Sequence, residues 1–184
     1  MAQRGPRRLE GEALWEYALR ALGGRAHSVA ELREKLRRRA DRQDDVDKVL
    51  ARLRQSGYLD DRRFAQSFAA SRLESQGFGR SRVLRDLRGK RVAPAVAEQA
   101  VKAAYSGVDE TGLIQAYLER KYRKTPLGAY LADPRHLAAA YRRLRLAGFS
   151  SGNVIRVLKQ YAERAEELES LEAEDTGSGG GAAC

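Results

Sequence analysis

The chain has 184 residues, of which 33% are charged and 7% aromatic, and its formal net charge at pH 7 is +10. This length suffices for one domain or for a short array of small modules with buried cores. No apolar stretch approaches the roughly 20 residues that a membrane-spanning helix needs, so a transmembrane protein is excluded. The only cysteine is Cys184, which excludes a disulfide framework and a cysteine-ligated zinc site.

The first residues are charged and lead into no apolar signal core, so we expect a cytoplasmic protein. Farther along, apolar residues recur at three- and four-residue spacing, which is typical of amphipathic helices. Ser28 and Glu31 form a capping box, Asp44 or Asp45 can cap the following helix, and Pro134 suits a first turn. The pattern predicts nine helices, at about residues 12–22, 28–39, 44–55, 61–75, 80–89, 94–104, 110–123, 133–147 and 151–171.

The helical pattern repeats along the chain. When Leu36, Leu87 and Leu144 are superimposed, apolar residues follow ten, thirteen and fourteen positions later in each copy. A helix with large apolar residues precedes each of these sets. We therefore expect an all-α protein built as an elongated tandem array of three three-helix modules that resemble helix-turn-helix units.

The repeat also sets the expected boundaries of the parts. A basic N-terminal arm occupies residues 1–11, and the three modules occupy residues 12–60, 61–107 and 108–165. Residues 166–184 form a tail that is first acidic and then rich in glycine, a composition typical of flexible segments.

Positive charge is concentrated in the second and third modules. The net charge is +7 over residues 62–105 and +6 over residues 106–165, whereas residues 166–184 carry −6. A basic body indicates contact with a polyanion or with an acidic protein surface. Alternatively, each arginine is merely solvated or is paired with nearby acidic groups such as Glu34 and Asp86.

Helical periodicity selects candidates for the contact. On the helix at 80–89, Val83 and Leu87 share one face, and Arg82 and Arg85 point roughly the opposite way. The same construction applies to the helix at 133–147, with Arg142 and Arg143 pointing outward, and further basic residues lie at the end of the helix that precedes it. The candidate binding residues are Arg82, Arg85, Arg88, Lys90, Lys121, Arg123, Lys124, Arg142 and Arg143.

The sequence offers little for other chemistry. The paired carboxylates of Asp60 and Asp61 have no further acidic or histidine cluster nearby in sequence, and a helix cap, with Gly57 ending the preceding helix, explains the segment more simply. His27 and His136 are isolated in sequence, so we expect no metal site. We also expect no cofactor and no catalytic residue, and therefore a protein that is not an enzyme.

Sequence-specific duplex binding by the helix-turn-helix-like units is an alternative. Base reading usually requires Arg, Asn or Gln at the N-terminal end of a recognition helix. The helix at 94–104 instead exposes Glu98, Gln99 and Lys102 among alanines. This favours contacts that are protein-directed or independent of base sequence.

Three stretches carry a more specific pattern. They are Arg25-x-x-Ser28-x-x-Glu31-Leu32-x-x-Lys35-Leu36, then Gly57-Tyr58-Leu59-Asp60-Asp61-x-x-Phe64-Ala65 followed by Arg72 and Gly77, and finally Gly79-x-x-Arg82-Val83-x-x-Asp86-Leu87-x-x-Lys90-Arg91-Val92. Together with the last module they cover about residues 13–161. They resemble the RecX regulatory family, small bacterial proteins that modulate the RecA recombinase.

Two positions depart from the family pattern. Asp86 replaces the commoner glutamate, and Arg91 stands where the family usually shows glycine at the end of a helix. A left-handed residue is costlier as arginine than as glycine, so we expect a different turn geometry before Val92.

The resemblance implies a cytoplasmic, non-enzymatic regulator of homologous recombination and DNA repair, connected with the SOS response. Such a protein binds RecA–single-stranded-DNA filaments and inhibits or modulates ATP hydrolysis, strand exchange and filament growth. The implied partners are the RecA filament and single-stranded DNA, with duplex DNA bound weakly, and no membrane. We expect a monomer. The alternative is a direct DNA-binding protein, helix-turn-helix-like or sequence-nonspecific, that does not depend on the recombinase.

Overall fold

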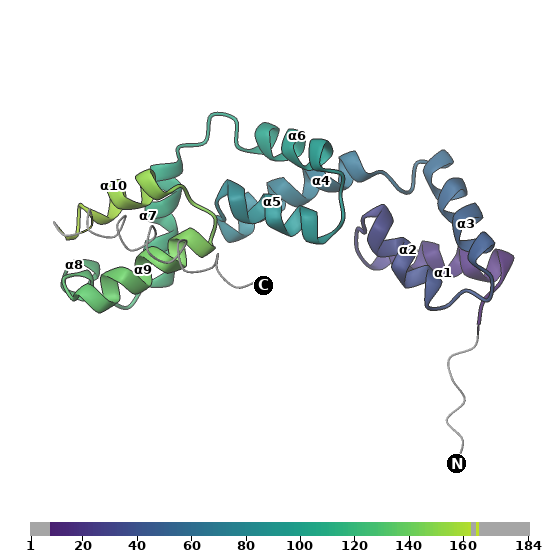
Figure 1. The fold of residues 1–184 in the computed structure, drawn as a ribbon, viewed down its shortest axis with the longest axis horizontal. Helices are drawn as coiled ribbons and strands as arrows, with labels where there is room; N and C mark the ends of the chain where they lie inside the picture. Colours follow the sequence, from purple (N-terminus) through teal and green to yellow (C-terminus); the bar gives the residue numbers. More distant parts are fainter. Residues whose placement is uncertain (1–7, 163–164, 166–184) are drawn as a thin grey trace, which may run out of the picture. The chain divides into compact units, whose positions relative to one another are not determined.

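The computed structural model describes residues 8–162 and residue 165. Its regular elements are α1 (Gly11–Gly24), α2 (Val29–Arg37), α3 (Gln43–Gln55), α4 (Asp61–Ser71), the π-helical turn η1 (Arg72–Gln76), α5 (Arg80–Gly89), α6 (Pro94–Ala104), α7 (Glu110–Lys121), α8 (Leu127–Leu131), α9 (Pro134–Leu146) and α10 (Ser151–Leu158). The described residues contain no β-structure beyond an isolated bridge between Leu9 and Ala40, which confirms the all-α class (Figure 1). The predicted tail (166–184) and residues 1–7 of the predicted arm lie outside the described residues.

Several predicted helix starts are confirmed by their caps. Ser28 and Glu31 form the reciprocal capping box of α2, and Asp133 caps α9 ahead of Pro134. The predicted caps of α3 are wrong, because α3 begins at Gln43 and no side chain caps it. Asp44 and Asp45 lie instead in its first turn, where carboxylates complement the helix dipole.

Two predicted helices end differently, and one helix was not predicted. The helix predicted at 61–75 is α-helical only to Ser71 and then becomes η1. The helix predicted at 151–171 ends at Leu158, and its last part, apart from residue 165, lies outside the described residues. The short helix α8 was not predicted, so the described part of the third predicted module contains four helices, α7 to α10, rather than three.

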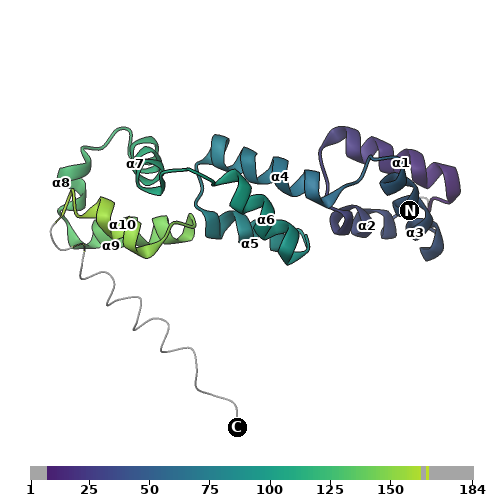
Figure 2. The same cartoon turned by 90° about the horizontal axis from the view of Figure 1, so that it is seen from above.

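The described residues form two compact units, and the first comprises residues 8–71 with 84–104. Its helices α1, α2 and α3 pack around apolar side chains such as Leu14, Leu36 and Leu53, which are fully buried. Helix α4 packs along α6, as Figure 2 shows. The packing of α1–α3 and that of α4 on α6 both follow from the amphipathic pattern, because each helix has one apolar face that it buries against a neighbour.

A set of polar contacts joins the start of α2 to α4 and to the turn after α5. The Ser28 hydroxyl donates to the Lys90 carbonyl over 2.7 Å, and the Lys90 ammonium lies 2.8 Å from the Glu31 carboxylate. The backbone N–H of Val29 donates to the Asp61 carboxylate over 2.8 Å. We call Ser28, Glu31, Asp61 and Lys90 the α2 clasp. The clasp holds the three-helix group α1–α3 against the elements that follow it within the first unit.

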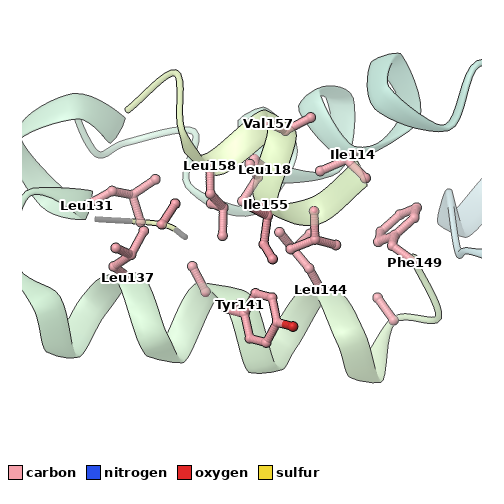
Figure 3. Packing of buried hydrophobic residues seen from close by; sticks show 14 residues of the cluster. Ile114, Leu118, Leu131, Leu137, Tyr141, Leu144, Phe149, Ile155, Val157 and Leu158 are labelled. Carbon is pink, nitrogen blue, oxygen red and sulfur yellow. The ribbon is translucent and has the colours of Figure 1, made fainter. Parts of the chain in front are cut away.

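The second unit comprises, of the described residues, 72–83 with 105–162 and residue 165. Its described helices α7 to α10 enclose an apolar core, shown in Figure 3, in which Ile114, Leu144 and Phe149 are fully buried. The Glu110 carboxylate at the start of α7 accepts hydrogen bonds from Ser150 and Asn153 at the start of α10. The two helices are therefore tied by polar contacts as well as by the core.

Two contacts fix the segment before α5 within this unit. The Tyr105 hydroxyl donates to the Phe78 carbonyl over 2.5 Å, and burial raises the pKa of Tyr105 to about 12. The Gly79 N–H donates to the Ala147 carbonyl over 2.9 Å. A Cβ built on Gly148 lies 2.3 Å from the Arg82 nitrogen, so only glycine permits this approach. The first turn of α5 thus rests directly on the turn between α9 and α10.

The turn at Arg91 ends α5 in the left-handed conformation. Its φ is +55°, the only positive φ of a non-glycine residue in the described chain. The N–H of Val92 donates to the Leu87 carbonyl and that of Arg91 to the Arg88 carbonyl, the Schellman pattern. The turn before Val92 therefore keeps the geometry that glycine favours, and the expectation of a different geometry is wrong. Arg91 adopts this strained backbone conformation although it is not glycine.

Replacing Arg91 with glycine is expected to stabilise the protein by about 0.5–1 kcal/mol, because relief of the left-handed strain exceeds the backbone entropy that glycine adds. Urea unfolding followed by circular dichroism measures the change. The matched control is Arg91→Ala, which removes the charge and keeps most of the strain. Equal gains in both variants would show that charge, not backbone strain, limits stability here.

Replacing Gly148 with alanine is expected to cost about 3 kcal/mol or more, because the new methyl group adds a clash to the left-handed strain. Gly107 is the matched control, since its φ of +73° is also left-handed and no atom lies within 4 Å of a Cβ built there. Gly107→Ala is expected to cost only about 1 kcal/mol in the same unfolding measurement. Similar losses at both positions would contradict the close packing between α5 and the α9–α10 turn.

Candidate functional site

The predicted binding residues of the first unit differ in exposure and in whether their charge is already paired within the protein. Arg85 and Arg88 are exposed on α5, and the Arg88 guanidinium lies 3.8 Å from the Glu98 carboxylate, a solvated pair of little energetic weight. Lys90 is half-buried in the α2 clasp, and its ammonium lies 5.4 Å from the ring centre of Phe68. The charge of Lys90 is therefore committed to Glu31 and to an aromatic ring within the protein.

The electrostatics of Glu31 reflect this commitment. Partial burial raises the pKa of Glu31, but hydrogen bonds from Lys90, Arg25 and the Ser28 backbone outweigh it and hold the pKa below its usual value. The carboxylate is thus ionised at neutral pH and accepts from both cations. Sequence reasoning assigned Lys90 to an external contact because Glu31, its partner, lies 59 residues away in the chain.

The second unit contains the other predicted cations. Arg82 is half-buried, with its guanidinium 5.3 Å from the ring centre of Phe78. The remaining five are exposed and lie near the end of α7 or on α9. We call them the α7–α9 basic surface: Lys121, Arg123, Lys124, Arg142 and Arg143.

One side-chain contact links the two halves of the α7–α9 basic surface. The Arg143 guanidinium on α9 donates to the Tyr122 hydroxyl over 3.3 Å and lies 5.8 Å from the centre of its ring. Because Tyr122 lies between Lys121 and Arg123 in the chain, this contact places α9 beside the end of α7. No carboxylate within residues 8–162 or at residue 165 forms an ion pair with Lys121, Arg123 or Arg142. The surface is therefore strongly cationic.

Aromatic rings that sequence reasoning had not selected accompany these cations. The ring centres of Tyr122 and Tyr130 lie 5.3 Å apart, and Tyr130 stacks on His136 at 4.0 Å. Burial raises the pKa of the Tyr122 hydroxyl, although Arg143 opposes the shift. Basic groups together with aromatic rings suit single-stranded nucleic acid, whose phosphates and bases need both. The signal was visible in the sequence as tyrosines interleaved with basic residues.

The remaining candidates have structural roles. Asp60 caps α4 by accepting from the N–H groups of Arg62 and Arg63, and Asp61 belongs to the α2 clasp, so the cap interpretation is confirmed. Within the described residues there is no group of three or more His, Cys, Asp or Glu side chains able to hold a metal ion. None of the described helices is both long and apolar enough to cross a membrane.

Comparison with known proteins identifies the family. Residues 15–53 match the first three-helix domain of RecX, and residues 60–101 match the second. The chain is 36% identical to the regulatory protein RecX of Chlorobaculum tepidum over 111 residues, which cover 60% of this chain and 67% of the relative. It is 30% identical to RecX of Syntrophotalea carbinolica over 147 residues, covering 80% and 92%. This chain belongs to the RecX family.

Solved structures agree with this assignment at the level of the fold. A crystal structure of RecX from Lactobacillus salivarius superimposes with a TM-score of 0.60 at 16% identity, covering 86% of this chain and 96% of that one. A second RecX crystal structure gives 0.60 at 21% identity, covering 80% and 70%. The resemblance drawn from the sequence is confirmed, and so is a RecX-type regulatory role. The cations of α5 lie within the second matched domain, whereas the α7–α9 basic surface lies beyond both matched domains.

Replacing Glu31 with glutamine is expected to lower stability at pH 7 by about 1–2 kcal/mol, because Lys90 and Arg25 lose a charged acceptor. A depressed pKa contributes stability above the unfolded value of 4.5 that is lost as the pH falls through the folded pKa. The difference between wild type and variant is therefore expected to shrink in acid. Urea unfolding at a series of pH values measures it. Glu34→Gln, at an exposed pair with Arg38, is the control and is expected to cost at most about 0.5 kcal/mol.

Proposed function

We propose that this RecX-family protein binds RecA–single-stranded-DNA filaments and inhibits or modulates their ATP hydrolysis, strand exchange and growth. The proposal rests on the family, whose relatives are regulatory proteins named RecX, and on one observation above all. Five exposed cations gather with Tyr122 on the α7–α9 basic surface. A RecA–single-stranded-DNA filament offers DNA phosphates and protein surface to a regulator. The positive charge of the α7–α9 basic surface can bind the phosphates or acidic side chains of the protein.

The physical basis is a polyelectrolyte contact. Each lysine or arginine that neutralises a phosphate releases condensed counterions, so the affinity gained is sequence-independent and falls with salt. Arg142 and Arg143 project from a regular helix, and Lys121 ends another, so much of the surface is held on rigid elements. A protein so bound across neighbouring recombinase subunits resists the subunit movements that accompany ATP turnover.

The cations of α5 contribute to the same contact in this proposal. Arg82, Arg85 and Arg88 supply charge directly, since weak surface pairs such as Arg88 with Glu98 exchange readily for phosphate. Lys90 acts through the α2 clasp, where its pairing with Glu31 holds the turn after α5 in place. The protein needs no catalytic group or cofactor for this role.

The test uses the charge reversal Lys121→Glu with Arg142→Glu, at two exposed positions. Added to preformed RecA filaments, the variant is expected to inhibit the DNA-dependent ATPase roughly tenfold less potently than wild type, because two contacts become repulsive. The matched control reverses Arg20 and Lys102, which are exposed on α1 and α6, and changes the net charge equally. Circular dichroism verifies that the variants fold.

Excess single-stranded DNA separates this function from direct DNA binding. Inhibition by the wild type that persists in excess DNA and requires fewer than one protein per recombinase subunit identifies a filament-directed regulator. Inhibition that excess DNA abolishes would instead establish the direct DNA-binding alternative. Equal potency of wild type and the Lys121–Arg142 variant would remove the α7–α9 basic surface from the proposal.

A further inference from the structure

The first unit contains a second basic site, separate from the α7–α9 basic surface. It is a hollow of about 560 Å³ between α1, α2 and the turn that follows α5. A cavity of this size is within the range that holds a small-molecule ligand. We call it the α2–α5 hollow, and the residues that line it include Tyr17, His27, Lys35, Arg39 and Arg91. Of the binding residues predicted from the sequence, it includes only Lys90.

Cations outnumber the carboxylates in this hollow. Its two carboxylates are already engaged, since Glu31 accepts from Arg25 and Lys90 and Glu34 accepts from Arg38. Lys35, Arg39 and Arg91 also line the hollow, and none of them forms an ion pair within residues 8–162. Their mutual repulsion in a concave site favours the binding of an anion.

A buried donor points to the same conclusion. In the described chain, Nε of Arg39 is a buried side-chain atom without a hydrogen-bond partner, and Arg39 lines the hollow. A buried N–H without an acceptor carries a desolvation cost that a bound phosphate oxygen offsets. Nδ1 of His27 lies 4.0 Å from the Glu31 carboxylate, and burial lowers the pKa of His27, so its neutral ring adds no positive charge to the hollow. The Arg39 guanidinium also lies 5.4 Å from the ring centre of Tyr17, which places an aromatic surface beside the cations.

Arg91 links the hollow to the strain in the backbone. Its left-handed φ of +55° disfavours any side chain, and yet the position carries a long cation that lines the hollow. Local strain of this kind persists where the surrounding structure enforces it, and it is often found at binding sites. Glycine would allow the same turn without the strain but would remove one of the three unpaired cations.

We propose that the α2–α5 hollow binds the phosphate groups of a nucleotide, with Lys35, Arg39 and Arg91 as the anion-binding groups. Tyr17 offers its ring to the base, since aromatic side chains stack on bases irrespective of sequence. The phosphate belongs either to a free nucleoside triphosphate or to a single strand. The site does not depend on the recombinase, so this inference stands or falls separately from the function proposed above.

The test uses a variant that we expect to be more stable than the wild type and yet to bind the nucleotide more weakly. Arg91→Gly is expected to fold more stably than wild type and to bind about five- to tenfold more weakly, so the loss of binding does not arise from unfolding. Lys35→Ala, on the exposed side of α2, is expected to weaken binding similarly. Lys102→Ala removes an exposed lysine of α6 outside the hollow and is expected to leave binding unchanged.

Two probes identify the source of the phosphate. Calorimetric titration with dTTP tests a free nucleotide, and fluorescence anisotropy of an end-labelled oligo(dT) tests a strand. Both are measured without recombinase and in the Lys121→Glu, Arg142→Glu background, so that the α7–α9 basic surface does not mask the effect. If Arg91→Gly weakens the binding of dTTP, the phosphate in the hollow belongs to a free nucleotide. If Arg91→Gly weakens only the binding of oligo(dT), the phosphate belongs to a single strand. The inference is overturned if neither probe binds, or if Lys102→Ala weakens binding as much as Arg91→Gly.

Discussion

The α2 clasp is the interaction on which the first unit depends. Isolated three-helix groups of about 50 residues bury too little apolar surface to be more than marginally stable. The Ser28 hydroxyl and Glu31 carboxylate, which cap α2, also bind Lys90, and Asp61 binds the N-terminal end of the same helix. The residues at the start of α2 therefore cap this helix and also join it to the turn after α5. Because these groups are partly buried, removing one partner leaves another polar group unsatisfied, which makes the junction more costly to break than a surface pair.

The second unit relies on a different constraint, close backbone contact at glycine. Gly148 and Gly79 approach so closely that a Cβ on either would lie within 2.5 Å of the other segment. The N–H groups of Gly79 and Ser81 use this proximity to donate to the carbonyls of Ala147 and Gly148. Apolar burial around Phe149 supplies most of the stabilisation, and the glycines set how closely the elements meet. The core does not use the charges of Lys121 and Arg142, which are exposed on α7 and α9 and form no ion pair within the described residues.

Local features of the fold were predictable from the sequence, and long-range partners were not. The capping box of α2 and the Asp133 cap of α9 involve residues within three positions of one another, so their pattern is visible in the chain. Helix α8 has only five residues, too few to produce a periodic signal. Lys90 was assigned to binding because its partner Glu31 is remote in sequence. The α7–α9 basic surface was predicted as separate segments, and only the Arg143–Tyr122 contact shows that they meet.

Arg91 shows how stability and function compete at one residue. Glycine is the more stable residue at a left-handed helix end, by about 1 kcal/mol, and in this proposal the cost of arginine is offset by the charge that its side chain adds to the hollow. The Arg91 side chain lines a hollow whose other unpaired cations, Lys35 and Arg39, come from α2 and the turn after it. The clasp brings these elements together by joining α2 to Lys90, the residue next to Arg91. The contact that stabilises the first unit is thus also the one that assembles its anion site, so weakening the clasp must affect both.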